Sequence, residues 1–476
     1  MWRFKSPPAF DLPDTAIFLA QLNGAAALFA PAQPLAAARA PGRLDLMGGI
    51  ADYSGALVLE LPLACATWAA AQWTDSPAVT IRSANAAEVG GVAQVTVPLA
   101  DLLGDYALVR QRLAASPAEH WAAYVLGALT LLHGERGVRF PRGLNVFVAS
   151  DVPAGKGVSS SAAIEVAAMQ ALLALLDLTL PARDLALLCQ KVENLIVGAP
   201  CGVMDQMTAA AGVQGGLLAL LCQPAELQPA VQLPEALEVW GLDSGLRHAI
   251  SGADYGSVRV GAFMGYRIVA ALAGLPAAPA GASRVSIDDP RWQGYLANVA
   301  PSDWEACFRD QVPEALTGAE FLARYGGFTD AVTRIDPERT YAIRQPAAHP
   351  IYEHHRVSLF RALLEKPHLA ENDFALLGEL MYQSHLSYGA CGLGSDGTDQ
   401  LVEMVRALGP AAGLYGAKIT GGGSGGTVAV LARRGSAETV AALARDYAAQ
   451  TGRAAHVLGG SSPGVLQFGV HWMTNG

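Results

Sequence analysis

Residues 151–163, DVPAGKGVSSSAA, place two glycines, a lysine and three consecutive serines directly before an apolar helical pattern. A helix that begins at these serines presents free backbone N–H groups and the positive end of its dipole, which together bind anions. Gly155 and Gly157 allow the backbone to approach phosphate oxygens, and the serine hydroxyls are suitable partners for phosphate or Mg²⁺. This is not a Walker A loop, because Lys156 is followed by glycine and not by serine or threonine. The segment predicts an anion site, although a serine N-cap after an ordinary glycine turn has a similar pattern.

A second glycine-rich segment, residues 418–427 (KITGGGSGGT), has five glycines in six positions between two apolar runs. Glycine loses much conformational entropy on folding, so a loop of this composition requires a physical reason. A plain linker is the alternative, although linkers rarely join two apolar strands. We therefore expect this loop to approach a ligand or another loop closely.

Isolated charges mark two further segments. Arg43, Asp45 and Asp52 lie in a glycine-rich and otherwise apolar stretch, and Asp205 is the only charged residue within residues 194–225. Buried charges must be paired or must bind something polar. A surface turn for the first segment and a helix cap for Asp205 are the alternatives. Without further context, the residues of these two segments are candidate site residues only.

Taken together and in their order along the chain, these segments resemble the GHMP kinase family, and within it the galactokinase branch. Residues 153–163 fit P-x-G-x-G-x-S-S-S-A-A, and residues 420–426 fit T-G-G-G-x-G-G. The galactokinase branch also has G-R-x-N-x-I-G-E-H-x-D-Y and C-G-x-M-D-Q, which here read GRLDLMGGIADY and CGVMDQ. Residues 121–127, WAAYVLG, resemble a further galactokinase segment near the nucleotide. The resemblance extends over nearly the whole chain.

The resemblance implies a kinase that uses ATP and Mg²⁺ to phosphorylate the anomeric hydroxyl of a monosaccharide. Carried over position by position, it implies that Asp205 is the catalytic aspartate, that Arg43 pairs with it, and that Ser161 and Glu193 bind Mg²⁺. The positions implied for the sugar are Asp52, Gly49, Ile50, Gly202 and Tyr255. The positions implied for ATP are Gly155, Lys156, Gly157, Ser159, Ser160, Ser161 and Trp121.

The chain departs from the galactokinase pattern at Gly49 and Ile50, where that branch has glutamate and histidine. In that branch the acidic residue contacts the C6 hydroxyl of the sugar, and glycine has no side chain to do so. A buried hydroxyl without a partner costs about 1–3 kcal/mol, so galactose should be disfavoured by roughly 10–100-fold. L-Arabinopyranose has the ring stereochemistry of galactose without the C6 group. We therefore expect L-arabinose as the substrate and L-arabinose 1-phosphate as the product.

Two alternatives remain open. The first is a kinase for galactose or for another sugar such as a uronic acid, whose carboxylate would need a nearby cation such as Arg247 or His248. The second is a non-catalytic sugar or ATP sensor on the same fold. The presence of Asp205 and of the three serines argues against a sensor.

Apolar periodicity predicts the elements that position these segments. Residues 143–150 alternate as a strand that leads into the phosphate segment, and helices follow from residue 159 to about 178 and over 182–197. Proline and glycine in residues 274–303 and 342–352 predict surface loops there. The chain as a whole is predicted to be a mixed α/β or α+β protein.

The family resemblance implies a two-domain GHMP kinase fold. Residues 1–228 are expected to form a ribosomal-protein-S5-like α/β domain that contains the sugar loop, the phosphate loop and the catalytic aspartate. Residues 229–476 are expected to form a ferredoxin-like α+β domain.

Composition limits the partners. The chain has 476 residues, a net charge of −10 and a pI near 5.5, which argues against nucleic acid or an anionic membrane surface. The first residues lack the apolar core of a secretory signal, and no apolar run is long enough to cross a membrane. Six scattered cysteines without a CxxC pair predict reduced thiols and a cytoplasmic protein. The expected partners are a sugar and ATP, and the expected state is a monomer or a weak homo-oligomer.

Overall fold

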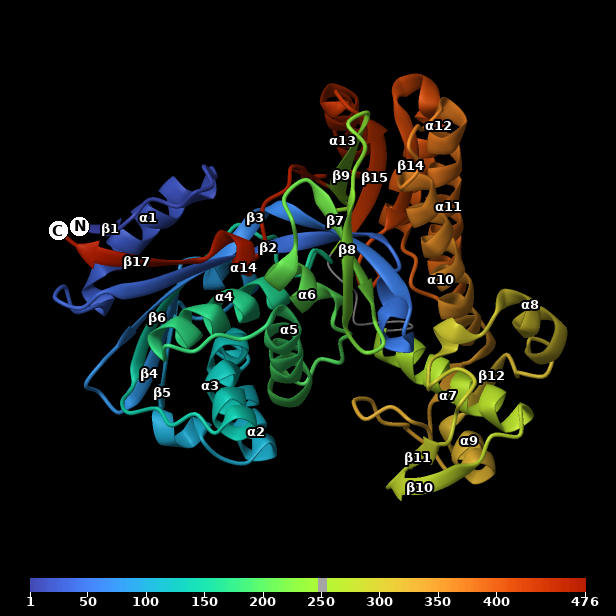
Figure 1. Cartoon of the computed structure of the whole chain (residues 1–476), viewed down its shortest axis with the longest axis horizontal. Coiled ribbons are helices and arrows are strands. Elements are labelled where there is room, and N and C mark those ends of the chain that lie inside the picture. The colour runs from blue at the N-terminus through green and yellow to red at the C-terminus, as the bar shows by residue number, and fades with distance from the viewer. Residues whose placement is uncertain (247–254) are drawn as a thin grey trace.

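The computed structural model describes residues 1–246 and 255–476, and two main sheets organise them (Figure 1). The larger sheet follows the order β1-β17-β2-β3-β6-β4-β5, while β7 pairs with another part of β3 and β8 pairs with β7. Its strands are β1 (Trp2–Phe4), β2 (Leu35–Met47), β3 (Leu57–Trp73), β4 (Ala78–Ser83), β5 (Gln94–Pro98), β6 (Leu144–Ser150), β7 (Gly216–Leu221), β8 (Glu226–Gln232) and β17 (Val470–Asn475). Neighbours are antiparallel except β4 and β6, which are parallel. Because β17 pairs with β1 and β2, the two ends of the chain lie side by side.

Successive side chains of the central strands point to opposite faces of this sheet, and a separate core covers each face. Val146 and Val148 of β6 face the core beneath α4, whereas Phe147 and Ala149 face the core beneath α1. On the second face, the ring of Phe18 in α1 stacks on Trp68 with 4.4 Å between ring centroids. The helices of this half are α1 (Asp14–Gly24), α2 (Tyr106–Ala114), α3 (Ala123–Arg136), α4 (Ser160–Leu175), α5 (Ala182–Lys191), α6 (Met204–Ala211) and the short α14 (Val465–Phe468).

The smaller sheet is antiparallel and follows the order β14-β15-β9-β16. Its strands are β9 (Leu237–Asp243), β14 (Leu414–Ile419), β15 (Thr427–Arg433) and β16 (Val457–Leu458). The helices of this half are α7 (Tyr255–Leu272), α10 (Arg344–Leu364), α11 (Glu371–Ala390), α12 (Asp396–Leu408) and α13 (Ala437–Thr451). Apolar side chains of α11, β14 and β15 join those of β2 and β3 in one core, so the two sheets are packed together.

A third region extends from α7 at the lower right of Figure 1. It has its own aromatic core and comprises β10 (Ala277–Gly281), β11 (Arg284–Ile287), α8 (Pro301–Asp303), β12 (Ala315–Thr317), α9 (Gly318–Tyr325) and β13 (Thr340–Ala342). Residues 274–303, expected to be a surface loop, therefore contain a β-hairpin and short helical turns.

The predicted α+β class is confirmed, and so are the strand over residues 143–150 and the helix that follows the phosphate segment. The surface loop predicted over residues 342–352 is wrong, because α10 begins at Arg344 and residues 346–351 are mostly buried. Pro346 lies in the first turn of α10, where a backbone N–H has no acceptor within the helix, so the lack of an N–H in proline costs no hydrogen bond. Pro350 lies further inside the helix, and its burial against the neighbouring elements outweighs its poor helix propensity.

The domain boundary expected after residue 228 falls inside β8, which belongs to the larger sheet. Among the described residues, none of the helices combines the length and the apolar character needed to span a membrane.

Candidate active site

A buried arginine holds a partly exposed aspartate at the centre of the site. Arg43 on β2 donates from Nε to Oδ1 of Asp205 at 2.9 Å, and its Nη2 lies 2.7 Å from the same oxygen. Its Nη1 donates to the carbonyl of Gly157 in the phosphate loop at 2.6 Å. The side chain of Asp205 is 22% exposed and that of Arg43 is 3% exposed. A ligand can therefore reach the carboxylate while its cation stays covered.

Further carboxylates surround Arg43. Burial alone would lower the pKa of Arg43, but Asp205, Glu60 and Asp45 together raise it above its ordinary value, so the guanidinium stays charged. Glu60 lies 3.4 Å from Arg43 Nε, and its buried oxygens have no hydrogen-bond partner. Burial and then Asp45 raise the pKa of Glu60 well above its ordinary value.

The 3-10 turn Gly49–Ser54 carries Asp52 toward the same centre. Asp52 is 5% exposed, and its Oδ1 has no hydrogen-bond partner. Burial, followed by the nearby charge of Asp205, raises the pKa of Asp52 to about 7. Gly202 lies against this carboxylate, and a Cβ at that position would collide with it. Glycine is therefore required at position 202, and Asp52 has an unsatisfied oxygen that a sugar hydroxyl can satisfy.

The remaining residues implied for the sugar lie beside Asp52. The rings of Tyr255 and Tyr53 meet edge to face with 5.6 Å between centroids. Gly49 and Ile50 are both buried, and Ile50 belongs to an apolar cluster with Tyr388. These two residues begin the turn Gly49–Ser54, and neighbouring residues cover them.

Arg259 on α7 is a site residue that the sequence did not reveal. It is 6% exposed and forms two bonds of 2.9 Å with the carboxylate of Asp330. It also donates to the carbonyl of Cys201 at 3.1 Å, and its guanidinium lies over the ring of Tyr53. Arg259 therefore joins the third region to the segment that contains Gly202. Arg259 and Arg267 are the two arginines of this largely apolar helix, and nothing in the local sequence distinguishes Arg259 for this role.

The phosphate loop has a strained and unsatisfied serine at its centre. Ser159 precedes α4 with φ 61°, a left-handed conformation that is costly for serine. Its hydroxyl is buried and has no hydrogen-bond partner. Strain and an orphaned hydroxyl at a helix N-terminus are consistent with a bound anion. Lys156 points elsewhere, with Nζ 3.0 Å from Oδ2 of Asp243 on β9.

The second glycine-rich loop packs directly on the phosphate loop. A Cβ on Gly426 would lie 2.7 Å from the carbonyl oxygen of Lys156, and a Cβ on Gly421 would lie 2.7 Å from that of Gly157. Thr427 Oγ1 donates to the same Lys156 carbonyl at 2.8 Å. The predicted close approach to another loop is confirmed, and it explains the absence of side chains at these positions.

Ser161 and Glu193 come together next to Asp205. Glu193 lies in the π-helical turn Val192–Val197 that continues α5, and it forms a side-chain hydrogen bond with Ser161. Burial and then Asp205 raise the pKa of Glu193 to about 7. The amide of Gln206 donates to Glu193 at 2.8 Å and to Glu165 at 3.2 Å, so a second buried carboxylate lies behind the first. In the sequence, Glu165 is only one residue of the helix predicted from residue 159 to about 178.

This oxygen set suits Mg²⁺, which takes few protein ligands and keeps phosphates and waters as the others. Among residues 1–246 and 255–476, no three His, Cys, Asp or Glu side chains gather closely enough to hold a metal alone. Ser161 and Glu193 offer two oxygen ligands, and phosphate oxygens and waters would complete the coordination of Mg²⁺.

A cavity of about 350 Å³ opens beside the start of α4. Trp121 lies at its wall in the 3-10 turn His120–Ala122, and its indole N–H donates to the carbonyl of Val92 at 3.0 Å. Gly155, Ser160 and Ser161 also line the cavity. Aromatic and apolar walls beside a helix N-terminus suit a purine base with phosphates.

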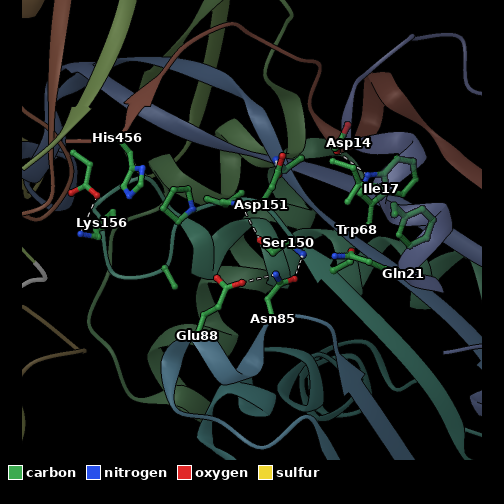
Figure 2. A pocket seen from close by; sticks show the side chains of 17 residues that line it. Asp14, Ile17, Gln21, Trp68, Asn85, Glu88, Ser150, Asp151, Lys156 and His456 are labelled. Carbon is green, nitrogen blue, oxygen red and sulfur yellow. Dashed lines mark hydrogen bonds and ion pairs between the residues drawn. The ribbon is translucent and has the colours of Figure 1, made fainter. Parts of the chain in front are cut away.

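Figure 2 shows a second cavity, of about 460 Å³, on the other side of residues 150–154. Asn85 bonds to Glu88 at 2.9 Å and accepts from the backbone N–H of Ser150 at 2.9 Å on the wall that the two cavities share. The acidic residues of its lining are Asp14, Glu88, Asp151 and Asp243, and its basic residues are Lys156 and His456. Since Lys156 is already paired with Asp243, this lining disfavours a triphosphate.

Comparison with known protein families identifies three matching regions. Residues 123–213 match the GHMP kinases N terminal domain, residues 360–449 match the GHMP kinases C terminal domain, and residues 26–72 match the galactokinase galactose-binding signature. The Arg43 segment lies in the last match, and the phosphate loop and Asp205 lie in the first.

Individual proteins agree with these matches. The chain is 42% identical to the L-arabinokinase of Arabidopsis thaliana over 94% of its own length, but it spans only 47% of that protein. It is 30% identical to the galactokinase of Chloroflexus aggregans, with 84% of each chain covered. The crystal structure of Lactococcus lactis galactokinase complexed with galactose superposes with a TM-score of 0.71 at 20% identity, and covers 94% of this chain and 99% of that one.

Proposed function

The chain belongs to the GHMP kinase family, in its galactokinase branch, and on that premise we propose that it transfers the γ-phosphate of ATP to the anomeric hydroxyl of L-arabinose. The observation that carries the proposal is the Arg43–Asp205 pair. It joins the phosphate loop, through the carbonyl of Gly157, to a carboxylate that remains partly exposed.

Asp205 is proposed to orient the attacking hydroxyl. The anomeric oxygen forms a bond to the γ-phosphorus, the bond to the bridging oxygen of ADP breaks, and the hydroxyl proton leaves toward Asp205. Phosphoryl transfer leaves positioning and electrostatics as the main tasks of the protein. Arg43 lies 2.7 Å from Asp205 and stays charged, so the carboxylate of Asp205 is paired and fixed in position. Its larger contribution is the orientation of the hydroxyl.

The nucleotide is proposed to enter the 350 Å³ cavity, with its base beside Trp121 and its phosphates at Ser159, Ser160 and Ser161. Mg²⁺ held by Ser161 and Glu193 would neutralise charge on those phosphates. The helix dipole of α4 and the N–H groups at its start act in the same direction. The phosphate-loop residues Gly155, Lys156 and Gly157 shape the backbone around this site.

L-Arabinose is preferred to galactose because position 49 supplies no partner for a C6 hydroxyl. Asp52, Gly202 and Tyr255 are proposed to bind the ring hydroxyls. The 42% identity to a plant L-arabinokinase supports this assignment. A uronic acid would need a cation, and the two candidates, Arg247 and His248, lie outside the described residues.

The six cysteines are free thiols, which supports a reducing compartment such as the cytoplasm.

A panel of sugars tests the proposed substrate. ADP release should be measured with ATP, Mg²⁺ and saturating L-arabinose, D-galactose or D-galacturonate, and the phosphorylated product identified by NMR. We expect L-arabinose to give the highest kcat/KM, exceeding galactose by about 10–100-fold. Turnover of galactose equal to or above that of L-arabinose would contradict the pentose assignment.

The role of Asp205 is tested by Asp205→Asn, which keeps the size of the side chain and removes its charge. We expect phosphorylation to fall by at least about 10²-fold, because an amide does not accept the proton and carries no charge to pair with Arg43. ATP affinity, measured by calorimetry, should be unchanged. Asp184→Asn is the matched control, since it breaks an exposed ion pair with Arg136 and should leave activity intact. A wild-type chain that binds sugar without turnover would instead indicate a sensor.

A further inference from the structure

A tyrosine hydroxyl fills the space that a side chain at position 49 would occupy. A Cβ built on Gly49 would collide with Oη of Tyr388 and would lie 2.6 Å from Oδ2 of Asp45. The φ of Gly49 is +45°, which also disfavours a side chain. In this chain, therefore, no acidic residue can be placed at position 49 without displacing Tyr388.

The hydroxyl of Tyr388 also anchors the turn that bears the sugar residues. It accepts from the backbone N–H of Ile50 at 2.9 Å and donates to the carbonyl of Gly421 at 3.1 Å. It thus joins α11 to the turn Gly49–Ser54 and to the second glycine-rich loop. Since these two bonds use its donor and one acceptor position and Tyr388 is fully buried, the hydroxyl does not itself reach a ligand.

The ring of Tyr388 is fixed from two sides. Lys418 Nζ lies 5.2 Å from the ring centroid, and the ring of His349 meets it edge to face at 5.2 Å between centroids. His349 Nδ1 is in turn bonded to Ser387 at 2.7 Å. These contacts hold the tyrosine ring in its position beside Gly49.

We propose that Tyr388 is a specificity-determining positioning residue, which fills the space beside Gly49 and so keeps an acidic side chain, the partner that a C6 hydroxyl would need, out of position 49. Its hydroxyl takes the volume in which a side chain at position 49 would begin, and it anchors the turn at Ile50. The site keeps its ring-hydroxyl partners, but a hexose finds no polar partner at C6. This inference rests on the proposed function and explains how the chain sustains the loss of the galactokinase glutamate.

The first experiment removes one oxygen. Tyr388→Phe should lower kcat/KM for L-arabinose by about five- to tenfold, because Ile50 N–H and the Gly421 carbonyl lose their partner. The loss should appear mainly as a higher KM for the sugar, with the KM for ATP unchanged. Tyr266→Phe is the matched control, since it removes a tyrosine hydroxyl bonded to Asp289 in the third region and should leave both constants unchanged.

The second experiment is a double-mutant cycle on sugar selectivity. Gly49→Glu, Tyr388→Ala and the double variant should be compared with the wild type in kcat/KM for D-galactose and for L-arabinose. Gly49→Glu alone should lose activity on both sugars, because its side chain collides with Tyr388. The double variant should recover turnover and raise the ratio of galactose to L-arabinose by about tenfold or more over Tyr388→Ala.

The outcomes separate the inference from the function it rests on. If the wild type phosphorylates neither sugar, the proposed function fails and the inference fails with it. If the wild type prefers L-arabinose but the double variant and Tyr388→Ala have the same sugar ratio, only the inference is overturned. If thermal melting shows that the double variant does not fold, Tyr388→Phe decides, and an unchanged KM for L-arabinose overturns the inference.

Discussion

Asp52 carries a carboxylate that the fold encloses without satisfying. It is 5% exposed, its Oδ1 has no partner, and burial together with Asp205 raises its pKa to about 7. Arg259 favours the charged form but is itself occupied by Asp330. A buried carboxylate without a partner is costly, and a hydroxyl of a bound ligand would supply the missing hydrogen bond.

Asp52→Asn should therefore stabilise the chain in the absence of ligand at high pH. The pKa of Asp52 is about 7 in the folded chain and about 4 in the unfolded chain, so stability falls as pH rises through this interval. The cost is complete above pH 7 and amounts to at most about 4 kcal/mol. We expect Asp52→Asn to melt at a higher temperature than the wild type at pH 8, and this gain to be less than half as large at pH 5.

The same melts should include Asp75→Asn, which changes an exposed aspartate paired with Arg142 and should shift the melting temperature at neither pH. A melting temperature for Asp52→Asn below that of the wild type at pH 8 would show that the carboxylate is better satisfied than the structure indicates.

At this scale the sequence predicts residues that belong to local motifs and misses those that do not. It anticipated the contact of Arg43 with Asp205, which the structure shows, while the roles of the two residues stay predictions. Tyr388, Arg259 and Glu165 lie on regular helices far along the chain from their partners. Nothing in the spacing around such residues records what they contact.

The contact between the two glycine-rich loops depends on positions that have no side chain. The loop between β14 and β15 can touch the phosphate loop because Gly426 has no side chain there. Thr427 then fixes the carbonyl of Lys156. The glycine-rich loop thus supports the backbone of the phosphate loop at residues 156 and 157.

Gly426→Ala should push the two loops apart. Its Cβ would lie 2.7 Å from the Lys156 carbonyl, and the φ of Gly426 is +81°. We expect kcat/KM for ATP to fall by about tenfold or more, since a displacement near 1 Å in a positioning loop has an effect of this order. The matched control is Gly435→Ala, which has a similar φ of +92° but nothing within 4 Å of its Cβ. Equal losses in the two variants would assign the effect to backbone strain alone.

Elements with strong local patterns were predicted well, and those decided by tertiary packing were not. The strand before the phosphate loop and α4 after it follow from alternation and serine placement. The helix predicted over residues 182–197 is split, because α5 ends at Lys191 and a π-helical turn then carries Glu193. No composition rule reveals such a turn, although π-helical turns are frequent at functional sites.

At the scale of the whole molecule, a buried ion pair joins the two sheets beside the site. Lys418 on β14 and Asp45 on β2 are both fully buried, with 2.5 Å between Nζ and Oδ2. Asp45 also accepts from the backbone N–H of Gly49 at 2.9 Å, and its own N–H donates to Thr420 at 2.8 Å. The two halves are therefore coupled through the segment that leads into the turn Gly49–Ser54.

Such long-range pairings lie beyond what the sequence alone can predict. The pairing of β17 with β2 joins the last residues of the chain to a strand more than 400 residues away. The acidic second cavity in Figure 2 is likewise assembled from α1, β6 and residues near position 456. Apolar patterns predicted a mixed α/β or α+β chain and the family resemblance implied two domains, but neither predicted which segments meet.

Lys418→Met tests whether the ion pair holds the halves together. The substitution leaves Asp45 as a buried carboxylate without its cation, which costs about 3–5 kcal/mol. We expect the urea midpoint to fall, with sugar turnover lost at lower urea concentrations than in the wild type. Lys366→Met breaks an exposed pair with Asp373 and should cost no more than about 1 kcal/mol.

Asp45→Asn combined with Lys418→Met should recover most of the loss, because asparagine can still accept from Gly49 and carries no charge. A double variant as unstable as Lys418→Met would show that the lysine contributes through its contact with Tyr388 and its packing, and not through the pair.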